Sequence, residues 1–131
     1  MTGVQTCALP IYTGNALACA AANATLDIFE RDNVIEKNRE TAVYMGEKLA
    51  RFKNLKNVGS VRQTGMICAI ELQGYDPKER VGLQVYNYGL KKGVLLRPLG
   101  HIVYFMPPYI ITKEECDVMM DVAYEAIESL I

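Results

Sequence analysis

The first half of the chain contains two stretches in which apolar side chains recur at helical spacing. The first stretch follows Asn15, whose side chain suits the capping position of a helix, and it is rich in alanine. The second starts at Asn33, which has Glu36 at the spacing of a capping box, and it keeps an apolar face as far as Phe52. The pattern therefore predicts two consecutive helices.

On the polar face of the second helix, Glu47 and Arg51 have the spacing of a helical ion pair, and we expect them to form one. Shorter apolar runs then replace the helical period. Residues 58–63 and 66–72 favour two strands separated by a two-residue turn with glycine. Apolar side chains alternate along the second run, which predicts that at least one face of this strand is buried.

Helical spacing returns over residues 78–92, and we expect Gly93 to end that helix because glycine adopts the left-handed conformation at little cost. Two apolar, β-branched runs, Val94–Leu96 and Ile102–Phe105, then predict a hairpin with a short glycine-containing turn. Thr112 begins the last helix, since it has the acidic residue of a full capping box at the required spacing.

The predicted order is helix, helix, strand, strand, helix, strand, strand, helix. Consecutive strands joined by tight turns pair antiparallel, and helices bury one face of such a sheet. We therefore expect an α+β fold with a small, mostly antiparallel sheet covered by helices on one side. A chain of 131 residues is long enough for one domain with a hydrophobic core.

Arg97 is the main candidate for chemistry, because it follows an apolar run and its planar guanidinium matches the geometry of a carboxylate. The residues alone leave two interpretations open: Arg97 binds an anionic ligand, or it forms an ion pair with an acidic residue of the same chain. Arg62, within a predicted strand, favours a structural role over an anion site. His101, in the turn near Arg97, is either a site residue or a solvated turn residue.

Composition excludes several classes of protein. The net charge is −1 and half of the residues are hydrophobic, which argues against disorder and against a nucleic-acid surface. No apolar run approaches the roughly 18–20 residues that span a bilayer. The four cysteines (Cys7, Cys19, Cys68 and Cys116) are scattered, and His101 is the single histidine, so we expect buried, reduced thiols and no metal site.

Residues 1–11 do not continue the pattern that starts at Tyr12. They lack charge and periodicity, and they resemble the translation of a common sequencing adapter. We therefore expect this segment to be foreign to the natural protein and exclude it from the fold.

Three stretches carry a resemblance to a known family. YTGNALACAAANATLDIFE, from Tyr12, is similar to the segment after the phosphate-binding turn of class III, fold-type I, pyridoxal-phosphate-dependent aminotransferases. VGSVRQTGMICAIEL, from Val58, and GVLLRPLGHIVYFMPPYIIT, from Gly93, resemble the adenosylmethionine-8-amino-7-oxononanoate aminotransferases within that class. The resemblance covers residues 12–131.

This resemblance implies that the chain is the C-terminal small domain of such an enzyme, together with the helix that enters it. The intact enzyme would be a cytoplasmic homodimer that uses pyridoxal 5′-phosphate. It would pass the amino group of S-adenosylmethionine, or of lysine as in some relatives, to 8-amino-7-oxononanoate in biotin biosynthesis. By the same resemblance, Arg97 binds the carboxylate of the keto substrate and Tyr104 lies near the substrate.

The chain departs from the family where the cofactor binds. No lysine here matches the motif of the Schiff-base lysine, so we expect no catalytic residue and no activity from the chain by itself. The small hydroxyl residue that holds the cofactor phosphate is expected at the position of Ile11. Two alternatives stay open: another class III aminotransferase, of acetylornithine, GABA or ω-amino acid type, and a free-standing carboxylate-binding α+β module.

Overall fold

The computed structural model describes residues 15–130, which fall into two units divided after Glu36. The first unit contains helix α1 (Ala16–Arg31). As predicted, Asn15 caps α1: its side-chain oxygen accepts the backbone N–H groups two and three residues further on, at 3.0 and 3.2 Å. The predicted start of the first helix is confirmed.

Asn33 lies between α1 and helix α2 (Val34–Leu49) and has a φ of 49°, the left-handed conformation that often ends a helix. Its N–H donates to the carbonyl of Glu30 at 3.3 Å. A capping residue needs an extended backbone. Asn33 therefore ends α1 and does not begin α2 in the manner predicted.

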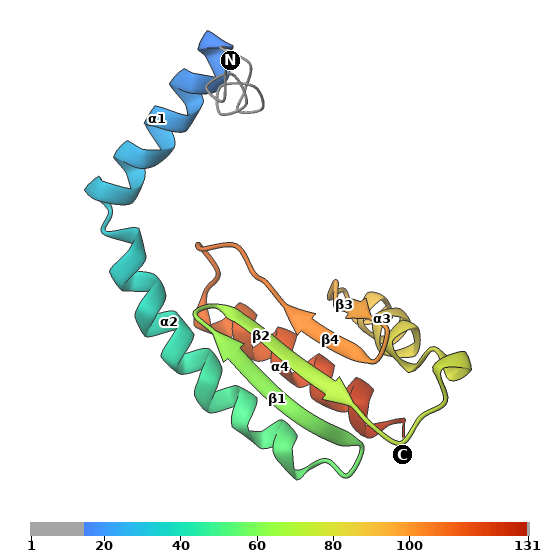
Figure 1. The fold of residues 1–131 in the computed structure, drawn as a ribbon. Coiled ribbons are helices and arrows are strands. Elements are labelled where there is room, and N and C mark those ends of the chain that lie inside the picture. Colours follow the sequence, from blue (N-terminus) through green and yellow to red (C-terminus); the bar gives the residue numbers. More distant parts are fainter. Residues whose placement is uncertain (1–14, 131) are drawn as a thin grey trace, which may run out of the picture. The chain divides into compact units, whose positions relative to one another are not determined.

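The second unit starts at Lys37, within α2, and contains a sheet (Figure 1). The remaining elements, in chain order, are a 3₁₀ turn (Ala50–Asn54), β1 (Val58–Thr64), β2 (Ile67–Leu72), a 3₁₀ turn (Pro77–Glu79), α3 (Val81–Lys91), β3 (Arg97–Leu99), β4 (Ile102–Phe105) and α4 (Lys113–Glu128). The strands form one antiparallel sheet in the order β1-β2-β4-β3. The predicted α+β fold is confirmed.

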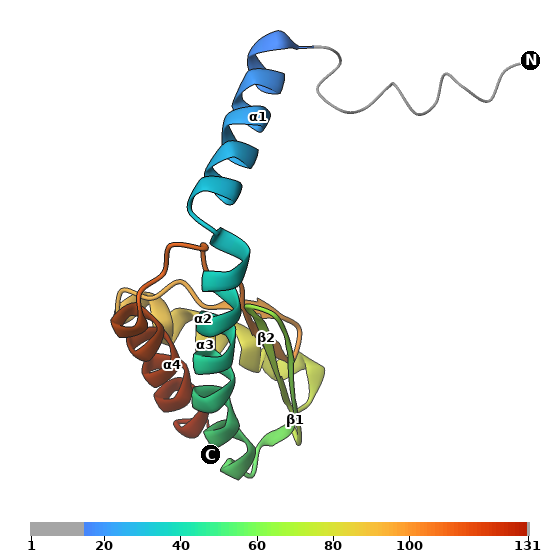
Figure 2. The same ribbon diagram turned by 90° about the vertical axis from the view of Figure 1, so that its left-hand side faces the viewer.

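Alternate residues of the strands face the core. Cys68, Ile70 and Leu72 of β2 are buried, whereas the residues between them are more exposed. Val103 and Phe105 of β4 are buried in the same way. In Figure 2, which shows the sheet edge-on, α2 and α4 lie on the same side of it. Among residues 15–130, no helix is both long and apolar enough to cross a bilayer.

The third helix is shorter than predicted. It starts at Val81 because Arg80 has a φ of 51° and separates it from the 3₁₀ turn at Pro77–Glu79. The 3₁₀ turn has its own capping box. The Asp76 side chain accepts the N–H two residues on at 2.8 Å, and the Glu79 carboxylate accepts the Asp76 N–H at 2.6 Å.

The first strand of the hairpin lies further along the chain than predicted, at Arg97–Leu99 instead of residues 94–96. After α3, Gly93 has a φ of 78°. Its N–H and that of Val94 donate back to carbonyls in the last turn of α3, at 3.1 and 2.9 Å. These two bonds form a Schellman motif, which confirms that Gly93 ends the helix. Because Val94 is part of this motif, the strand begins later in the chain.

A polar cluster joins α2 to α4. The Asp117 carboxylate on α4 accepts a hydrogen bond from the Tyr44 hydroxyl at 2.7 Å and lies 2.8 Å from the Lys48 ammonium. The ammonium groups of Lys48 and Lys113 lie 5.2 and 5.3 Å from the centre of the Tyr44 ring. The cluster thus ties the two helices together at the surface of the domain.

Arg51 forms a second link between these parts of the chain. It pairs with Asp121 of α4, and its guanidinium carbon lies 5.0 Å from the centre of the Tyr124 ring. The predicted pair between Glu47 and Arg51 is therefore wrong. Arg51 lies in a 3₁₀ turn, where residues four apart no longer share a face, and a helical pair contributes only about 0.2–0.5 kcal/mol.

Asp117→Asn should destabilise the domain at neutral pH but not in acid. Hydrogen bonds from Lys48 and Tyr44 hold the pKa of Asp117 below its ordinary value. A carboxyl whose pKa is lowered by folding stabilises the fold above its unfolded pKa, and this stabilisation is lost as the pH falls through its folded pKa. The difference in urea unfolding between wild type and variant should therefore shrink below about pH 4. A constant difference from neutral to acidic pH would contradict this role.

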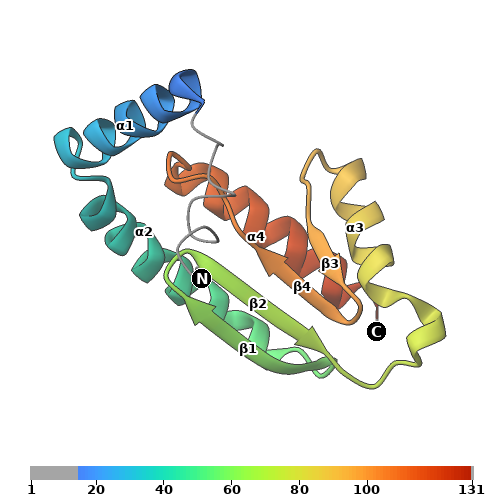
Figure 3. The same cartoon turned by 45° about the horizontal axis from the view of Figure 1, so that its top comes forward.

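Two glycines let other parts of the chain lie close against α3: the hairpin of β3 and β4 at Gly82, and the segment that precedes β3 at Gly89 (Figure 3). A Cβ on Gly82 would lie 2.9 Å from the Cβ of Pro98 and closer still to the carbonyl oxygen of Gly100. A Cβ on Gly89 would lie 2.8 Å from the carbonyl oxygen of Val94. Backbone atoms cannot move aside without shifting a whole element, so neither position accommodates a larger residue freely.

Gly82→Ala is expected to lower the free energy of unfolding by about 1–3 kcal/mol, because the added methyl overpacks the contact with the hairpin. In an exposed helix the same change would stabilise by roughly 0.5–1 kcal/mol. Asn87→Ala, at an exposed position of α3, is the matched control and should stay within about 0.5 kcal/mol of wild type. Urea unfolding measures both. A Gly82→Ala variant as stable as the control would rule out the close packing.

Candidate functional site

The hairpin of β3 and β4 brings the two predicted site residues together. Its turn is Gly100-His101, and Gly100 has a φ of 61°, as expected of a two-residue turn with glycine first. The register places Arg97 directly opposite Tyr104. Because opposed residues of antiparallel strands point to the same face, the two side chains are neighbours on the face of the sheet away from the buried residues.

The Arg97 side chain is exposed and has the Tyr104 ring as its neighbour. The guanidinium carbon lies 5.6 Å from the ring centre, within the range of a cation–π contact. In the part of the chain that the structure describes, the side chain of Arg97 forms no hydrogen bond and no ion pair. The internal ion pair that the sequence left open is therefore wrong for residues 15–130, and the fork of the guanidinium is free.

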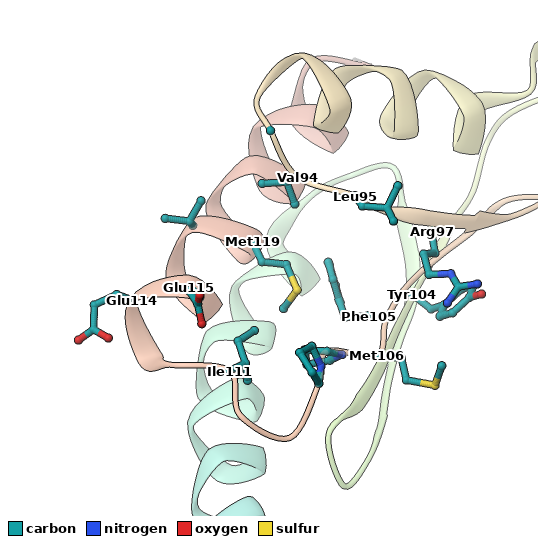
Figure 4. A pocket seen from close by; sticks show the side chains of 14 residues that line it. Val94, Leu95, Arg97, Tyr104, Phe105, Met106, Ile111, Glu114, Glu115 and Met119 are labelled. Atoms are coloured by element: carbon teal, nitrogen blue, oxygen red, sulfur yellow. The ribbon is translucent and has the colours of Figure 1, made fainter. Parts of the chain in front are cut away.

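A pocket of about 610 Å³ opens beside these residues, between the segment after α3, the end of β4 and the start of α4 (Figure 4). Most of its lining is apolar, including Val94, Leu95, Met106, Ile111, Val118 and Met119. Figure 4 shows Arg97 and Tyr104 side by side at one end of the lining residues, with Glu114 at the opposite end.

Charged groups are few in this pocket. Arg97 is the one cationic residue among the described residues that line it, and Glu114 and Glu115 are the acidic ones. Glu115 is occupied by the predicted capping box, in which its carboxylate accepts the Thr112 N–H at 2.9 Å. The pocket thus offers one unpaired guanidinium beside an apolar wall, which suits a ligand with a carboxylate and a hydrocarbon chain.

Two other candidate residues lie outside the pocket. His101 is in the turn at the far end of the hairpin, where its backbone carbonyl accepts the Leu72 N–H at 2.8 Å, and it does not line the pocket with Arg97. Arg62 points to the same face of the sheet as Arg97, on the β1 edge, but its guanidinium lies 3.5 Å from the Glu71 carboxylate. The sequence favoured a structural role for Arg62 over an anion site, and this ion pair is such a role.

The apolar lining was not predicted. Met120 is fully buried in the core, whereas Met119 beside it is half-buried and lines the pocket. Val118, more than half exposed, is its neighbour. One signal for this lining was available in the sequence: the apolar residues of α4 cover more of the helix surface than a single stripe. Met106 precedes the two prolines and Ile111 follows them by three residues, and neither belongs to a helical or strand pattern of apolar residues.

Thiols and metal ligands do not contribute to this site. Cys68 and Cys116 are fully buried, and burial raises the pKa of the Cys68 thiol to about 11, so neither is poised to act as a nucleophile. Cys19 is exposed, contrary to the expectation of buried thiols, and Cys7 lies outside the described residues. Residues 15–130 contain no group of three or more side chains placed to hold a metal ion.

The aminotransferase class-III family matches residues 8–127. The chain belongs to this family. It is 53% identical over 108 residues to the adenosylmethionine-8-amino-7-oxononanoate aminotransferase of Helicobacter pylori, covering 79% of the chain and 24% of that relative. With the enzyme of the same name from Anoxybacillus flavithermus the identity is 43% over 123 residues, covering 88% and 27%.

A solved structure agrees with these relatives. The crystal structure of the adenosylmethionine-8-amino-7-oxononanoate aminotransferase from Methanocaldococcus jannaschii superposes with a TM-score of 0.85 at 38% identity, covering 92% of this chain and 29% of that one. The class III small-domain fold expected from the sequence is thereby confirmed. The chain spans about a quarter of the length of the curated relatives it matches.

The described lining of this pocket does not fit pyridoxal phosphate, the cofactor that the family resemblance implies. Pyridoxal enzymes bind the cofactor through a lysine, and none of the described residues that line the pocket is a lysine. Ile11, at the position expected to hold the cofactor phosphate, lies outside the described residues, as do residues 1–11 as a whole. The assignment of that segment to an adapter stays a prediction, and the family match begins within it.

Proposed function

We propose that the chain is the C-terminal part of a transaminase that moves the amino group of S-adenosylmethionine to 8-amino-7-oxononanoate, a step of biotin biosynthesis. The names of the relatives support this reaction, and their identity to the chain extends over most of its length. Pyridoxal phosphate, a homodimeric parent and a cytoplasmic location belong to the same proposal and rest on the family resemblance.

The observation that carries the proposal is the unpaired guanidinium of Arg97 beside an apolar pocket. 8-Amino-7-oxononanoate carries a carboxylate on a hydrocarbon chain, and both of its parts find a matching surface here. A charge-assisted hydrogen bond to such a carboxylate contributes roughly 1.5–3 kcal/mol. Arg97 is the proposed carboxylate anchor, and Tyr104 belongs to the same substrate site.

Two other functions compete with this one. Another class III aminotransferase, of acetylornithine, GABA or ω-amino acid type, would use the same fold with a different donor or acceptor. A free-standing carboxylate-binding module would need no catalytic domain. The upstream residues of the substrate pocket would separate the two transaminases. The reading frame upstream of Tyr12 separates both from the module: a lysine-bearing aminotransferase domain joined directly to Tyr12 supports a transaminase, whereas a natural stop and start around residue 1 supports the module.

The chain by itself should have no transaminase activity, because no lysine lines its pocket to bind the cofactor. The assay incubates the chain with pyridoxal phosphate, S-adenosylmethionine and the keto acid, and detects the diamine product by mass spectrometry. An intact aminotransferase of the family is the positive control. Turnover by the isolated chain above the cofactor-only background would contradict the assignment.

In the intact parent, Arg97→Ala should raise KM for 8-amino-7-oxononanoate at least tenfold, in keeping with the loss of about 1.5–3 kcal/mol. The half-reaction with the amino donor should be nearly unchanged, because the donor reacts in a separate step. Arg62→Ala is the matched control, since Arg62 lies on the same face of the sheet but outside the pocket. Single-turnover kinetics measure each half-reaction. Equal damage to both by Arg97→Ala would count against the carboxylate role.

A further inference from the structure

The side chain opposite Arg97 suggests how the guanidinium is held. Tyr104 places its ring 5.6 Å from the guanidinium carbon, and within residues 15–130 its hydroxyl forms no hydrogen bond. We propose that Tyr104 is a positioning residue: its ring fixes the Arg97 guanidinium for a carboxylate ligand, and its hydroxyl does not bind the ligand. The inference rests on the proposed function only in taking Arg97 as the carboxylate anchor.

Arg97 needs such support because nothing else in the described chain orders it. It is exposed, and the residues two positions before and after it, Leu95 and Leu99, are apolar and 67% and 69% exposed. They offer the guanidinium no acceptor. A long side chain that becomes ordered only on binding loses affinity through the entropy of its rotamers, whereas one that is ordered beforehand does not.

Tyr104 is itself well placed to provide this support. It lies in β4 between Val103 and Phe105, whose side chains are buried at 0% and 2% exposure, so the backbone that carries the ring is anchored in the core. On the other side of the ring, its partner in β2 is Ala69, whose small side chain cannot cover it. The ring therefore has Arg97 as its large cross-strand neighbour.

The contact also leaves the binding groups of Arg97 available. A guanidinium carries five N–H donors, and a cation–π contact attracts its charge without pairing these donors with a carboxylate or carbonyl oxygen. An acidic partner at position 104 would order the same side chain but occupy its fork. An aromatic ring is thus suited to hold an arginine that must bind an external anion.

The competing role for Tyr104 is direct contact of its hydroxyl with the ligand. Two substitutions distinguish these roles. Tyr104→Phe keeps the ring and removes the hydroxyl, whereas Tyr104→Leu keeps an apolar side chain and removes the ring. Positioning through the ring requires that Phe behaves as wild type and Leu does not, while a hydroxyl contact requires that both variants lose affinity.

The experiment uses the 131-residue chain and NMR. The first measurement is the ring-current shift of the Arg97 δ-protons, which should persist in Tyr104→Phe and disappear in Tyr104→Leu. The second is the dissociation constant of nonanoate, a nine-carbon monocarboxylate. It should match wild type in Tyr104→Phe and rise about two- to fivefold in Tyr104→Leu, the effect of an exposed cation–π contact.

Tyr88→Leu is the matched control, because Tyr88 has Lys92 at the same 5.6 Å but does not line the pocket. It should leave nonanoate binding unchanged. Unchanged Arg97 shifts in Tyr104→Leu, or equal weakening by Tyr104→Phe and Tyr104→Leu, would overturn the positioning role. If the wild-type chain binds no nonanoate, Arg97 loses its assignment as the anchor. Wild-type affinity in Tyr104→Leu would instead overturn the role of Tyr104 alone.

Discussion

The antiparallel register of the sheet is the constraint on which the rest of the domain depends. Helices bury one face, so every second residue of a strand belongs to the core and the residues between them face the other way. Once Val103 and Phe105 are buried, Tyr104 must lie on the opposite face, and the turn at Gly100 places Arg97 directly across from it. A slip of one residue would turn both side chains into the core.

The helices are fitted to this sheet by small residues and by polar links at the surface. Gly82 lets α3 lie close against the hairpin, and Gly89 lets it lie close to the segment before β3. Asp117, Tyr44 and Lys48 hold α2 to α4. None of these residues lines the pocket.

The close packing of α3 and the polar links between α2 and α4 both fix the position of segments that border the pocket. Val94, on one side of the pocket, follows α3 closely in the chain, and α4 forms the opposite wall. The described residues thus provide a shaped apolar wall with one cationic side chain, that of Arg97.

Much of the fold was predictable because local signals agreed with tertiary packing. Asn15 and Thr112 cap their helices as their side chains require, and Gly93 ends α3. The failures occur where two local signals competed. Asn33 fits both a helix start and a helix end, and the left-handed conformation after α1 prevailed. Arg51 has the helical spacing to Glu47, but it lies in a 3₁₀ turn and pairs with Asp121 of α4.

The sequence by itself determined the class of fold and the family, and it singled out Arg97 as the candidate for binding an anion, because these inferences depend on periodicity and on motifs that are local in the chain. It could not decide whether Arg97 was paired, nor that its neighbour is the Tyr104 ring. It also missed the apolar wall around Met119. These features depend on which residues meet across strands and helices far apart in sequence. Only the tertiary structure shows an unpaired guanidinium beside an aromatic ring, because only the register of β3 with β4 brings them together.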